Sequence, residues 1–433
     1  MKNGVQIKYP RTLVISNNCF SKSGSNGRTL ANFFRGWPKK RLAQFYIQNE
    51  IPDSEVCDNY FRVTDSEAVQ SFITGQMVGE VVDYKKDEAN NIKDRGVGNK
   101  IIKRTPITSI LRDVIWNSYR WKKDNFNNWV EKFDPELILI QAGDSGFMLN
   151  LAVKLSKQFD IPLVIYNSES YYFKKYNYME GKGISSYFYS IFHKNLKKQY
   201  NKAIGRASHS IYICDMLKQE YDREFNKPST TIMTSTELKL SKGIKNKKVI
   251  PVISYLGNLG VGRDEPLIEI ANKLQEINSE FYLDVYGQIP SDEIKAKFEK
   301  CKGIRYKGLI TYDEVICVMQ NSDILVHGEN SADFYKEDLK YAFSTKIADS
   351  LASGTCFFVY APKEIACTKY LLDNECACVA TDINELKNKL KKILFNEDER
   401  QRYITNAQKI VIDNHNSEIN RQKFYNILCK AKR

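Results

Sequence analysis

The sequence VIPVISYLGNLGVGRDEPLIEIANKLQEI, residues 249–277, contains the transition that decides the fold. Its first part, Val249–Leu256, is apolar and rich in β-branched residues, which predicts a buried strand. Three glycines and an arginine follow in Gly257–Arg263, and Glu265–Ile277 then has the apolar period of an amphipathic helix. A buried strand that turns through glycines into a helix is typical of a parallel α/β sheet.

The same alternation of strand and helix extends through both halves of the chain. In the first half we predict strands at Thr12–Ser16, Leu42–Ile47, Leu137–Gln141, Leu163–Tyr166 and Ser210–Ile213. In the second half we predict strands at Val249–Leu256, Phe281–Tyr286, Ile324–His327, Cys356–Tyr360 and Cys376–Ala380. The pattern therefore predicts an α/β protein with two parallel sheets.

A chain of 433 residues is long enough for two or three domains. Residues 240–248 are polar and basic with no apolar period, and we predict that they link two domains. The expected boundaries are residues 1–240 and 249–414, followed by a C-terminal helix at 415–433 that crosses back to the first domain. Ligands of open parallel sheets bind at the carboxyl ends of the strands, so we expect the ligands in a cleft between the domains.

The net charge of +13 lies entirely in residues 1–245, which predicts an anionic partner for that half. The surplus is concentrated in Arg95–Lys123 and Lys174–Arg206, where basic residues alternate with bulky apolar and aromatic ones. This mixture is typical of segments that lie on an anionic membrane surface. The alternative is that the apolar side chains pack on the sheet and the lysines are solvated.

Several classes of protein are excluded by residues that the sequence lacks. The ten cysteines include no C-x-x-C pair, and the four histidines have no metal-ligand spacing. There is no signal-peptide apolar region and no apolar run of about 18 residues, so we expect a cytoplasmic protein that does not span a membrane. The G-x-S-x-G elbow of many hydrolases is missing too.

The glycine-rich loop Gly257–Arg263 could bind a phosphate group. Its glycines allow the backbone to approach an anion, the next helix offers free N–H groups, and Arg263 could make a bidentate contact. The order of the glycines differs from the dinucleotide fingerprint. A plain turn between strand and helix is the alternative interpretation.

A second segment, Phe343–Gly354, predicts a helix that Ser344 or Thr345 caps. Lys346 lies in its first turn, where a cation is unfavourable beside the helix dipole. Either Lys346 pairs with a carboxylate such as Asp349, or it faces an anionic ligand.

A third segment, Gly24, Ser25, Asn26 and Gly27, forms a donor-rich loop before a helix predicted at Leu30–Phe34. Such a loop suits a phosphate or a sugar, although an ordinary surface loop has the same composition.

Taken together, these segments resemble the two-domain GT-B nucleotide-sugar glycosyltransferases, in particular the large retaining family, family 4-like, of bacterial polysaccharide and glycolipid biosynthesis. The resemblance is strongest from Val249 to Asn414 and rests on Gly257–Arg263, Ser322–His327 and Ser344–Gly354. It implies two Rossmann-like domains that face each other across a cleft. It also implies transfer of a sugar, with retention, from a nucleotide-diphosphate donor to a hydroxyl of a glycan, glycolipid or lipid-linked acceptor.

The resemblance assigns roles to individual residues. Arg263 and Lys346 would hold the donor diphosphate, and Asp349 would hold the ribose hydroxyls. The full expected donor site is Gly257, Asn258, Gly260, Gly262, Arg263, Ser344, Thr345, Lys346 and Asp349. Since two cations can neutralise the leaving diphosphate, we expect neither a metal nor a cofactor.

The sequence also departs from this family. Tyr341 stands where the first of two family glutamates is usual, with Glu337 and Asp338 nearby. The family's histidine in the first domain is missing, and Asp144 or Glu169 could instead orient the acceptor hydroxyl or accept its proton. Each of these two acids has an alternative interpretation as a helix cap.

Two alternative functions stay open. One is a nucleotide-sugar epimerase with the same donor site. The other is a catalytically silent GT-B module that binds a glycan, a membrane or a nucleic acid through its basic half, motivated by Tyr341 and the net charge. We favour the enzyme over nucleic-acid binding because Arg263 and Lys346 are both present, and we predict a peripheral protein of the cytoplasmic membrane face.

Overall fold

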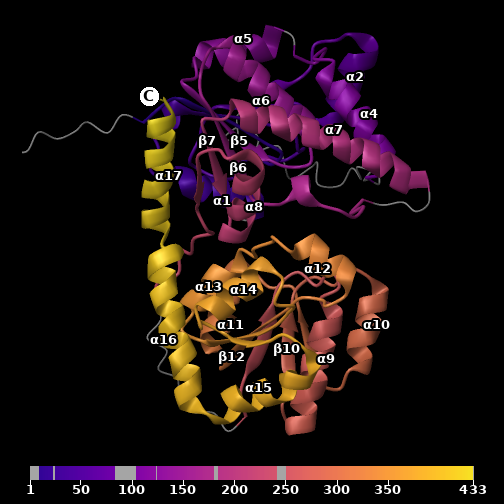
Figure 1. Ribbon diagram of the computed structural model, residues 1–433, viewed down its shortest axis with the longest axis vertical. Helices are drawn as coiled ribbons and strands as arrows, with labels where there is room; N and C mark the ends of the chain where they lie inside the picture. Colours follow the sequence, from indigo (N-terminus) through magenta and orange to yellow (C-terminus); the bar gives the residue numbers. More distant parts are fainter. Residues whose placement is uncertain are drawn as a thin grey trace, which may run out of the picture. The chain divides into compact units, whose positions relative to one another are not determined.

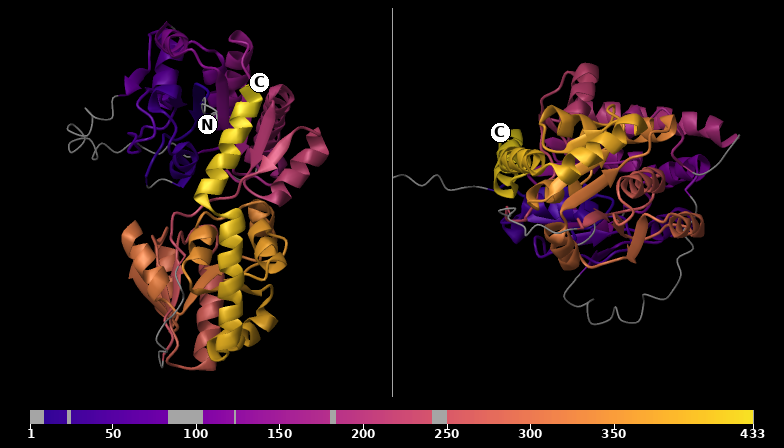
Figure 2. Two further views of the ribbon diagram at one scale, coloured as in Figure 1. Left: turned by 90° about the vertical axis from the view of Figure 1, so that its left-hand side faces the viewer. Right: turned by 90° about the horizontal axis from the view of Figure 1, so that it is seen from below.

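The computed structural model describes residues 9–22, 25–82, 104–122, 124–179, 184–240 and 250–432. The chain divides into two compact units, which Figures 1 and 2 colour by sequence. Unit 1 consists of Met1–Ile232 together with Glu418–Arg433, and unit 2 consists of Met233–Ser417. Of the linker predicted at residues 240–248, only Leu240 belongs to the described residues.

Unit 1 contains an eight-stranded sheet in the order β4-β3-β2-β1-β5-β6-β7-β8. Its strands are β1 (Thr12–Ser16), β2 (Leu42–Tyr46), β3 (Tyr60–Arg62), β4 (Glu80–Val82), β5 (Leu137–Ala142), β6 (Leu163–Asn167), β7 (His209–Tyr212) and β8 (Ser229–Thr231). All neighbours pair in parallel except β3 and β4. The central strands β1, β2, β5 and β6 are buried along their whole length, which explains their continuous apolar sequences.

The helices of unit 1 connect these strands, as parallel pairing requires. They are α1 (Ser25–Phe34), α2 (Asp65–Thr74), α4 (Pro106–Asn117), α5 (Asp124–Phe133), α6 (Gly146–Gln158), α7 (Ile184–Arg206), α8 (Asp215–Phe225) and α17 (Ser417–Lys432). Thr64 and Thr105 begin α2 and α4 with capping boxes, and Pro106 fits the first turn of α4.

Unit 2 contains a six-stranded sheet that is parallel throughout, in the order β11-β10-β9-β12-β13-β14. Its strands are β9 (Ile253–Leu256), β10 (Leu283–Tyr286), β11 (Ile304–Gly308), β12 (Ile324–Gly328), β13 (Cys356–Tyr360) and β14 (Cys378–Ala380). Its helices are α9 (Asp264–Ile277), α10 (Asp292–Lys300), α11 (Tyr312–Asn321), α12 (Asp333–Leu339), α13 (Lys346–Ala352), α14 (Ala366–Asp373), α15 (Ile383–Phe395) and α16 (Glu397–Asn414).

The sheet of unit 2 has the strand order 3-2-1-4-5-6 of Rossmann folds. The six inner strands of unit 1, β3-β2-β1-β5-β6-β7, follow the same pattern, so each sheet has a point where the order reverses. In unit 1 this point lies between β1 and β5, and in unit 2 it lies between β9 and β12. Ligands of such sheets bind at the carboxyl ends of the strands beside the reversal. The topology thus identifies one place in each unit where a site is expected.

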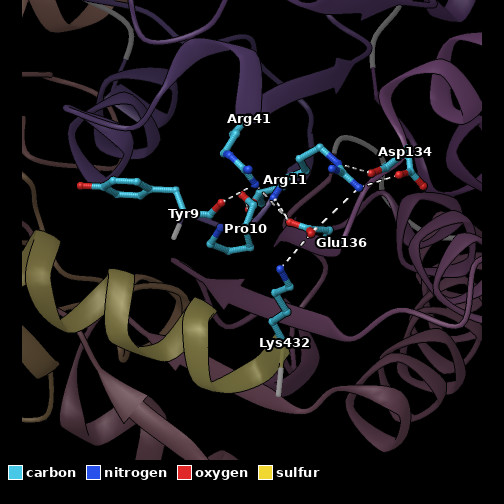
Figure 3. A network of polar contacts seen from close by, with 8 residues as sticks. Tyr9, Pro10, Arg11, Arg41, Asp134, Glu136 and Lys432 are labelled. Carbon is cyan, nitrogen blue, oxygen red and sulfur yellow. Dashed lines mark hydrogen bonds and ion pairs between the residues drawn. The ribbon is translucent and has the colours of Figure 1, made fainter. Parts of the chain in front are cut away.

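The last helix, α17, is yellow in Figure 1 and lies against unit 1. Phe424 is fully buried and stacks on Phe33, with 4.8 Å between the ring centroids. At the end of the helix, Lys432 Nζ lies 2.8 Å from Glu136 Oε1, within a network that also contains Arg11 and Arg41 (Figure 3). These contacts make the C-terminal helix a part of unit 1.

Among the described helices, none combines the length and the apolar character that crossing a bilayer requires.

Candidate active site

The loop after β9 is closely packed, and Gly262 within it and Gly287 beside it, after β10, leave no room for a side chain. The Gly257 N–H donates to the Tyr286 carbonyl over 2.9 Å, which joins the ends of β9 and β10. A Cβ on Gly287, whose φ is +151°, would lie 1.9 Å from the Gly257 carbonyl oxygen. Further along, Val261 and Gly262 have φ values of 62° and 69°, and this left-handed turn leads into α9.

Arg263 precedes α9 and forms a buried, bidentate ion pair with Glu329, the residue after β12. Arg263 Nε lies 2.9 Å from Glu329 Oε2, and Arg263 Nη2 lies 2.8 Å from Oε1. The side chains are 13% and 4% exposed. The pair therefore fixes the guanidinium at the point where the strand order of unit 2 reverses.

His327 supports the same carboxylate, because its Nε2 lies 3.0 Å from Glu329 Oε1. Burial alone would raise the pKa of Glu329, but His327 and Arg263 outweigh burial and lower this pKa to about 2. Glu329 is thus ionised at neutral pH. Removing Arg263 alone would leave the buried negative charge of Glu329 without its main partner and would destabilise the fold.

Lys346 begins α13, and its ammonium lies directly against the glycine loop. Nζ is 2.0 Å from the position that a Cβ on Gly257 would occupy, and 6.0 Å from the ring centroid of Tyr255. The pKa of Lys346 is lowered to about 8, mainly by burial and secondly by repulsion from Arg263. The attraction of Glu329 raises this pKa but does not outweigh them. Within the described part of the chain, Lys346 has no hydrogen-bond or ion-pair partner.

The predicted pair between Lys346 and Asp349 does not form. Asp349 is buried, and its Oδ1 accepts a hydrogen bond of 2.7 Å from Thr236 Oγ1. The predicted cap of this helix is also wrong: Thr345 occupies the N-cap position without a side-chain hydrogen bond, and Ser344 contributes only its carbonyl oxygen, to the Ile347 N–H. No side chain in the first turn of α13 therefore compensates the positive charge of Lys346.

Asn330 fixes the other side of the loop. Its Nδ2 donates to the Gly262 carbonyl over 3.0 Å and to Glu265 Oε2 over 2.7 Å. A Cβ on Gly262 would lie 2.9 Å from this Nδ2, so the close approach needs glycine. Sequence reasoning missed both Glu329 and Asn330, although they directly follow the strand predicted at Ile324–His327.

The remaining predicted donor residues lie in the same loop. Asn258 Oδ1 accepts from the Gly260 N–H over 2.8 Å, and the Asn258 carbonyl accepts from the Tyr255 hydroxyl over 2.6 Å. The loop therefore holds its own shape and presents two cations, one fixed by Glu329 and one unpaired. An anionic group would meet the uncompensated charge of Lys346 beside the guanidinium of Arg263.

In unit 1, Asp144 follows β5 and is 4% exposed. Its Oδ2 lies 2.8 Å from Arg104 Nη1 and accepts a hydrogen bond of 3.1 Å from the Tyr178 hydroxyl. Glu169 follows β6, is half-buried and contacts the Tyr171 hydroxyl. The pKa of Tyr171 is raised, mainly by burial and then by the negative charges of Glu169 and Asp144. Both acids thus lie at the carboxyl edge of the sheet.

The predicted loop at residues 24–27 is partly helical. Gly24 lies outside the described residues, whereas Ser25, Asn26 and Gly27 form the first turn of α1, five residues earlier than predicted. A Cβ on Gly27 would lie 2.2 Å from the Cys19 carbonyl oxygen. This glycine is thus explained by the packing of α1 against the segment after β1.

Residues 265–425 match the family model described as glycosyl transferase-like. Comparison of the sequence with curated proteins gave no match.

Three solved structures resemble the whole chain. HepE of Anabaena in complex with UDP has a TM-score of 0.64 at 12% identity, over 97% of this chain and 99% of that chain. WaaG, a glycosyltransferase involved in lipopolysaccharide biosynthesis, has a TM-score of 0.58 at 13% identity, over 96% and 99%. The sucrose-phosphate synthase of Thermosynechococcus elongatus has a TM-score of 0.61 at 11% identity, over 97% and 98%. The chain therefore has the GT-B fold of these glycosyltransferases.

The contact between Gly257 and Lys346 gives a direct test of the site. We expect Gly257→Ala to fold normally but to displace the flexible end of Lys346, and to lower the affinity for a nucleoside diphosphate about tenfold, the worth of one charged contact. Calorimetry with UDP, GDP and ADP measures this. Gly205→Ala in α7 is the control, because a Cβ there would meet no atom within 4 Å. Equal affinities of both variants and the wild type would place the anion site elsewhere.

Proposed function

We propose that this GT-B chain is a glycosyltransferase that moves a sugar from a nucleotide diphosphate to a hydroxyl acceptor. One observation carries the proposal: Arg263 ends the glycine loop after β9 and pairs with Glu329, and the ammonium of Lys346, far away in sequence, lies against the first glycine of that loop. The reversal of strand order in unit 2 is where a nucleotide is expected to bind. Structures of HepE contain UDP and UDP-glucose, which makes uridine nucleotides the first donors to test.

In this proposal the two cations act on the leaving group. When the bond between the anomeric carbon and the phosphate oxygen breaks, its electron pair stays on the diphosphate. Arg263, held by Glu329, and Lys346, which has no other partner, stabilise that charge without moving far. Two fixed cations can do the work of a divalent metal, so we propose a metal-independent reaction.

The finer assignments rest on the family resemblance and belong to the same proposal. They are retention of the anomeric configuration, contact of Asp349 with the ribose, and a role of Asp144 or Glu169 at the acceptor hydroxyl. Asp144 is supported by its fixed position between Arg104 and Tyr178. For Asp349, the hydrogen bond from Thr236 is a competing role.

Substitution of the two cations tests the reaction. The two variants are Lys346→Ala and the double variant Arg263→Ala with Glu329→Gln. We expect each variant to lower turnover about a hundredfold, because one charged contact to the leaving group contributes about 2 to 4 kcal/mol. The assay is release of nucleoside diphosphate, with UDP-glucose as the first donor tested. The second change in the double variant avoids an unpaired buried carboxylate.

The double variant has Glu329→Gln alone as its control, which keeps the arginine. Wild-type turnover by both cation variants, in protein that unfolds at the wild-type temperature, would contradict the proposal. A chelator should leave the wild-type rate unchanged. Release of nucleoside diphosphate should depend on an acceptor, whereas an epimerase would convert the donor without one.

We further propose that unit 1 lies on an anionic membrane surface, at the cytoplasmic face. Support comes from one face of α7, where Tyr187 and Ile191 are 69% and 43% exposed and Lys194, Lys198 and Lys202 follow at helical spacing, also exposed. Other residues of the two basic stretches have different roles: Trp116, Trp121, Tyr189 and Phe192 are buried in unit 1. Lys197 is half-buried, with its ammonium 4.7 Å from the ring centroid of Tyr172.

Sedimentation with vesicles tests the membrane proposal. We expect binding to vesicles that contain phosphatidylglycerol, and a loss of a hundredfold or more when Lys194, Lys198 and Lys202 become Glu, because each lysine contributes about 1 kcal/mol. The control reverses three exposed lysines of unit 2, Lys295, Lys300 and Lys302, with the same change in net charge. Equal losses in both triple variants, or equal binding of the wild type to neutral vesicles, would refute it.

A further inference from the structure

Unit 1 contains a cavity of about 410 Å³ at the point where its strand order reverses. Asn17, Gln48 and Ser145, which follow the ends of β1, β2 and β5, line the cavity from the sheet. Helices α2 and α4 supply the remaining walls. The cavity therefore lies where a sheet of this order binds its ligand.

One end of the cavity is polar and rigid. Arg112 Nε lies 2.8 Å from Asp65 Oδ1, and Arg112 Nη1 donates to Ser145 Oγ over 2.8 Å. Trp116 Nε1 donates to the same Asp65 oxygen over 2.8 Å. A carboxylate and a guanidinium held side by side offer both acceptors and donors, which suits a ligand with several hydroxyl groups.

Asn17 is an independent sign that this end takes a polar ligand. Its Oδ1 is buried and, among the described residues, has no hydrogen-bond partner. Its backbone is fixed, because its carbonyl accepts from the Ile47 and Gln48 N–H groups over 3.2 and 3.0 Å. A buried acceptor without a donor is costly, and a ligand hydroxyl at this place would supply the donor.

Part of the cavity lining is apolar and exposed. Val69 of α2 and Leu111 of α4 line it and are 39% and 56% exposed. The apolar surface continues beyond the cavity: Ile73 lies one turn after Val69, and Ile107 and Val114 flank Leu111 on α4. Ile73, Ile107 and Val114 are also exposed. We call these five side chains the apolar strip.

A polar cavity that opens onto an apolar strip suits a ligand with two chemically different ends. A free sugar would leave the strip in water, and a plain hydrocarbon would leave Asn17 Oδ1 without a donor. We infer that the acceptor is an amphiphile: its hydroxyl-bearing head occupies the cavity and its hydrocarbon chain lies along the apolar strip. This inference rests on the proposed function and specifies its acceptor class.

The test uses the full chain without nucleotide, and a probe whose two ends can be separated. Dodecyl maltoside, below its micelle-forming concentration, should bind with a stoichiometry near one and at least a hundredfold more tightly than maltose. Calorimetry measures both. We expect Leu111→Glu, which places a charge on the strip, to weaken dodecyl maltoside at least tenfold. Leu309→Glu is the matched control, since Leu309 is 74% exposed in unit 2.

Asn17→Ala tests the polar end and should weaken dodecyl maltoside severalfold without changing its stoichiometry. Equal affinities for maltose and dodecyl maltoside, or equal effects of the two leucine variants, would overturn the inference. So would a change in the oligomeric state of Leu111→Glu with unaltered probe binding, because the strip would then be a protein interface. UDP titrations of the same proteins keep the two proposals distinguishable. If UDP does not bind to the wild type, that result counts against the proposed donor site and not against the amphiphile site.

Discussion

The buried ion pair between Arg263 and Glu329 is the interaction on which the rest of the candidate donor site depends. It connects the start of α9 to the end of β12, across the reversal of strand order. Because Glu329 already neutralises Arg263, the positive charge of Lys346 is the one that lacks a partner. The glycine loop can then lie against the lysine, since Gly257 has no side chain to displace it. An anionic ligand would thus complete a set of charges that the fold leaves unbalanced.

The candidate sites of the two units lie at equivalent places in their sheets but differ in their chemistry. Both sheets reverse their strand order once, and in both the polar side chains of interest follow the strands beside that reversal. In unit 2 these are Arg263 and Glu329, which neutralise each other, and Lys346 beside them makes the site cationic. In unit 1 Asn17 and Asp144 follow β1 and β5, and the neighbouring cavity joins polar groups to an apolar surface. A donor with a charged leaving group and an acceptor with a hydrocarbon chain need these two different environments.

The sequence predicted the architecture because the buried strands are continuous apolar runs. Cys356–Tyr360 was predicted at its observed bounds, since every residue in it is buried. The sequence did not predict strands β3, β4, β8 and β11. Strands β3, β4 and β8 have three residues each, and β11 is a partly exposed edge strand, so none of them contains such a run. Strands β10 and β14 begin two residues later than predicted: Phe281 and Cys376 are buried, but the strand pairing starts at Leu283 and Cys378. Strand β9 begins at Ile253, after Ile250, which is 43% exposed.

The donor site was only half predictable. Lys346 was singled out from the sequence because a cation in the first turn of a helix is a local signal. The contact that fixes Arg263 is not local: Glu329 is 66 residues away, and no spacing rule connects the two. The partner of Asp349 is Thr236, 113 residues away, and only the folded chain brings them together.

Proton uptake on nucleotide binding tests the central claim most directly. A free Lys346 with a pKa of about 8 is half protonated at pH 8, and a bound diphosphate raises that pKa. Calorimetry at pH 8 in buffers of different ionisation enthalpy should therefore show uptake of about half a proton when the best of UDP, GDP and ADP binds. Lys346→Arg, which stays charged, should abolish the uptake. Binding without proton uptake in the wild type, or equal uptake in the arginine variant, would contradict the account.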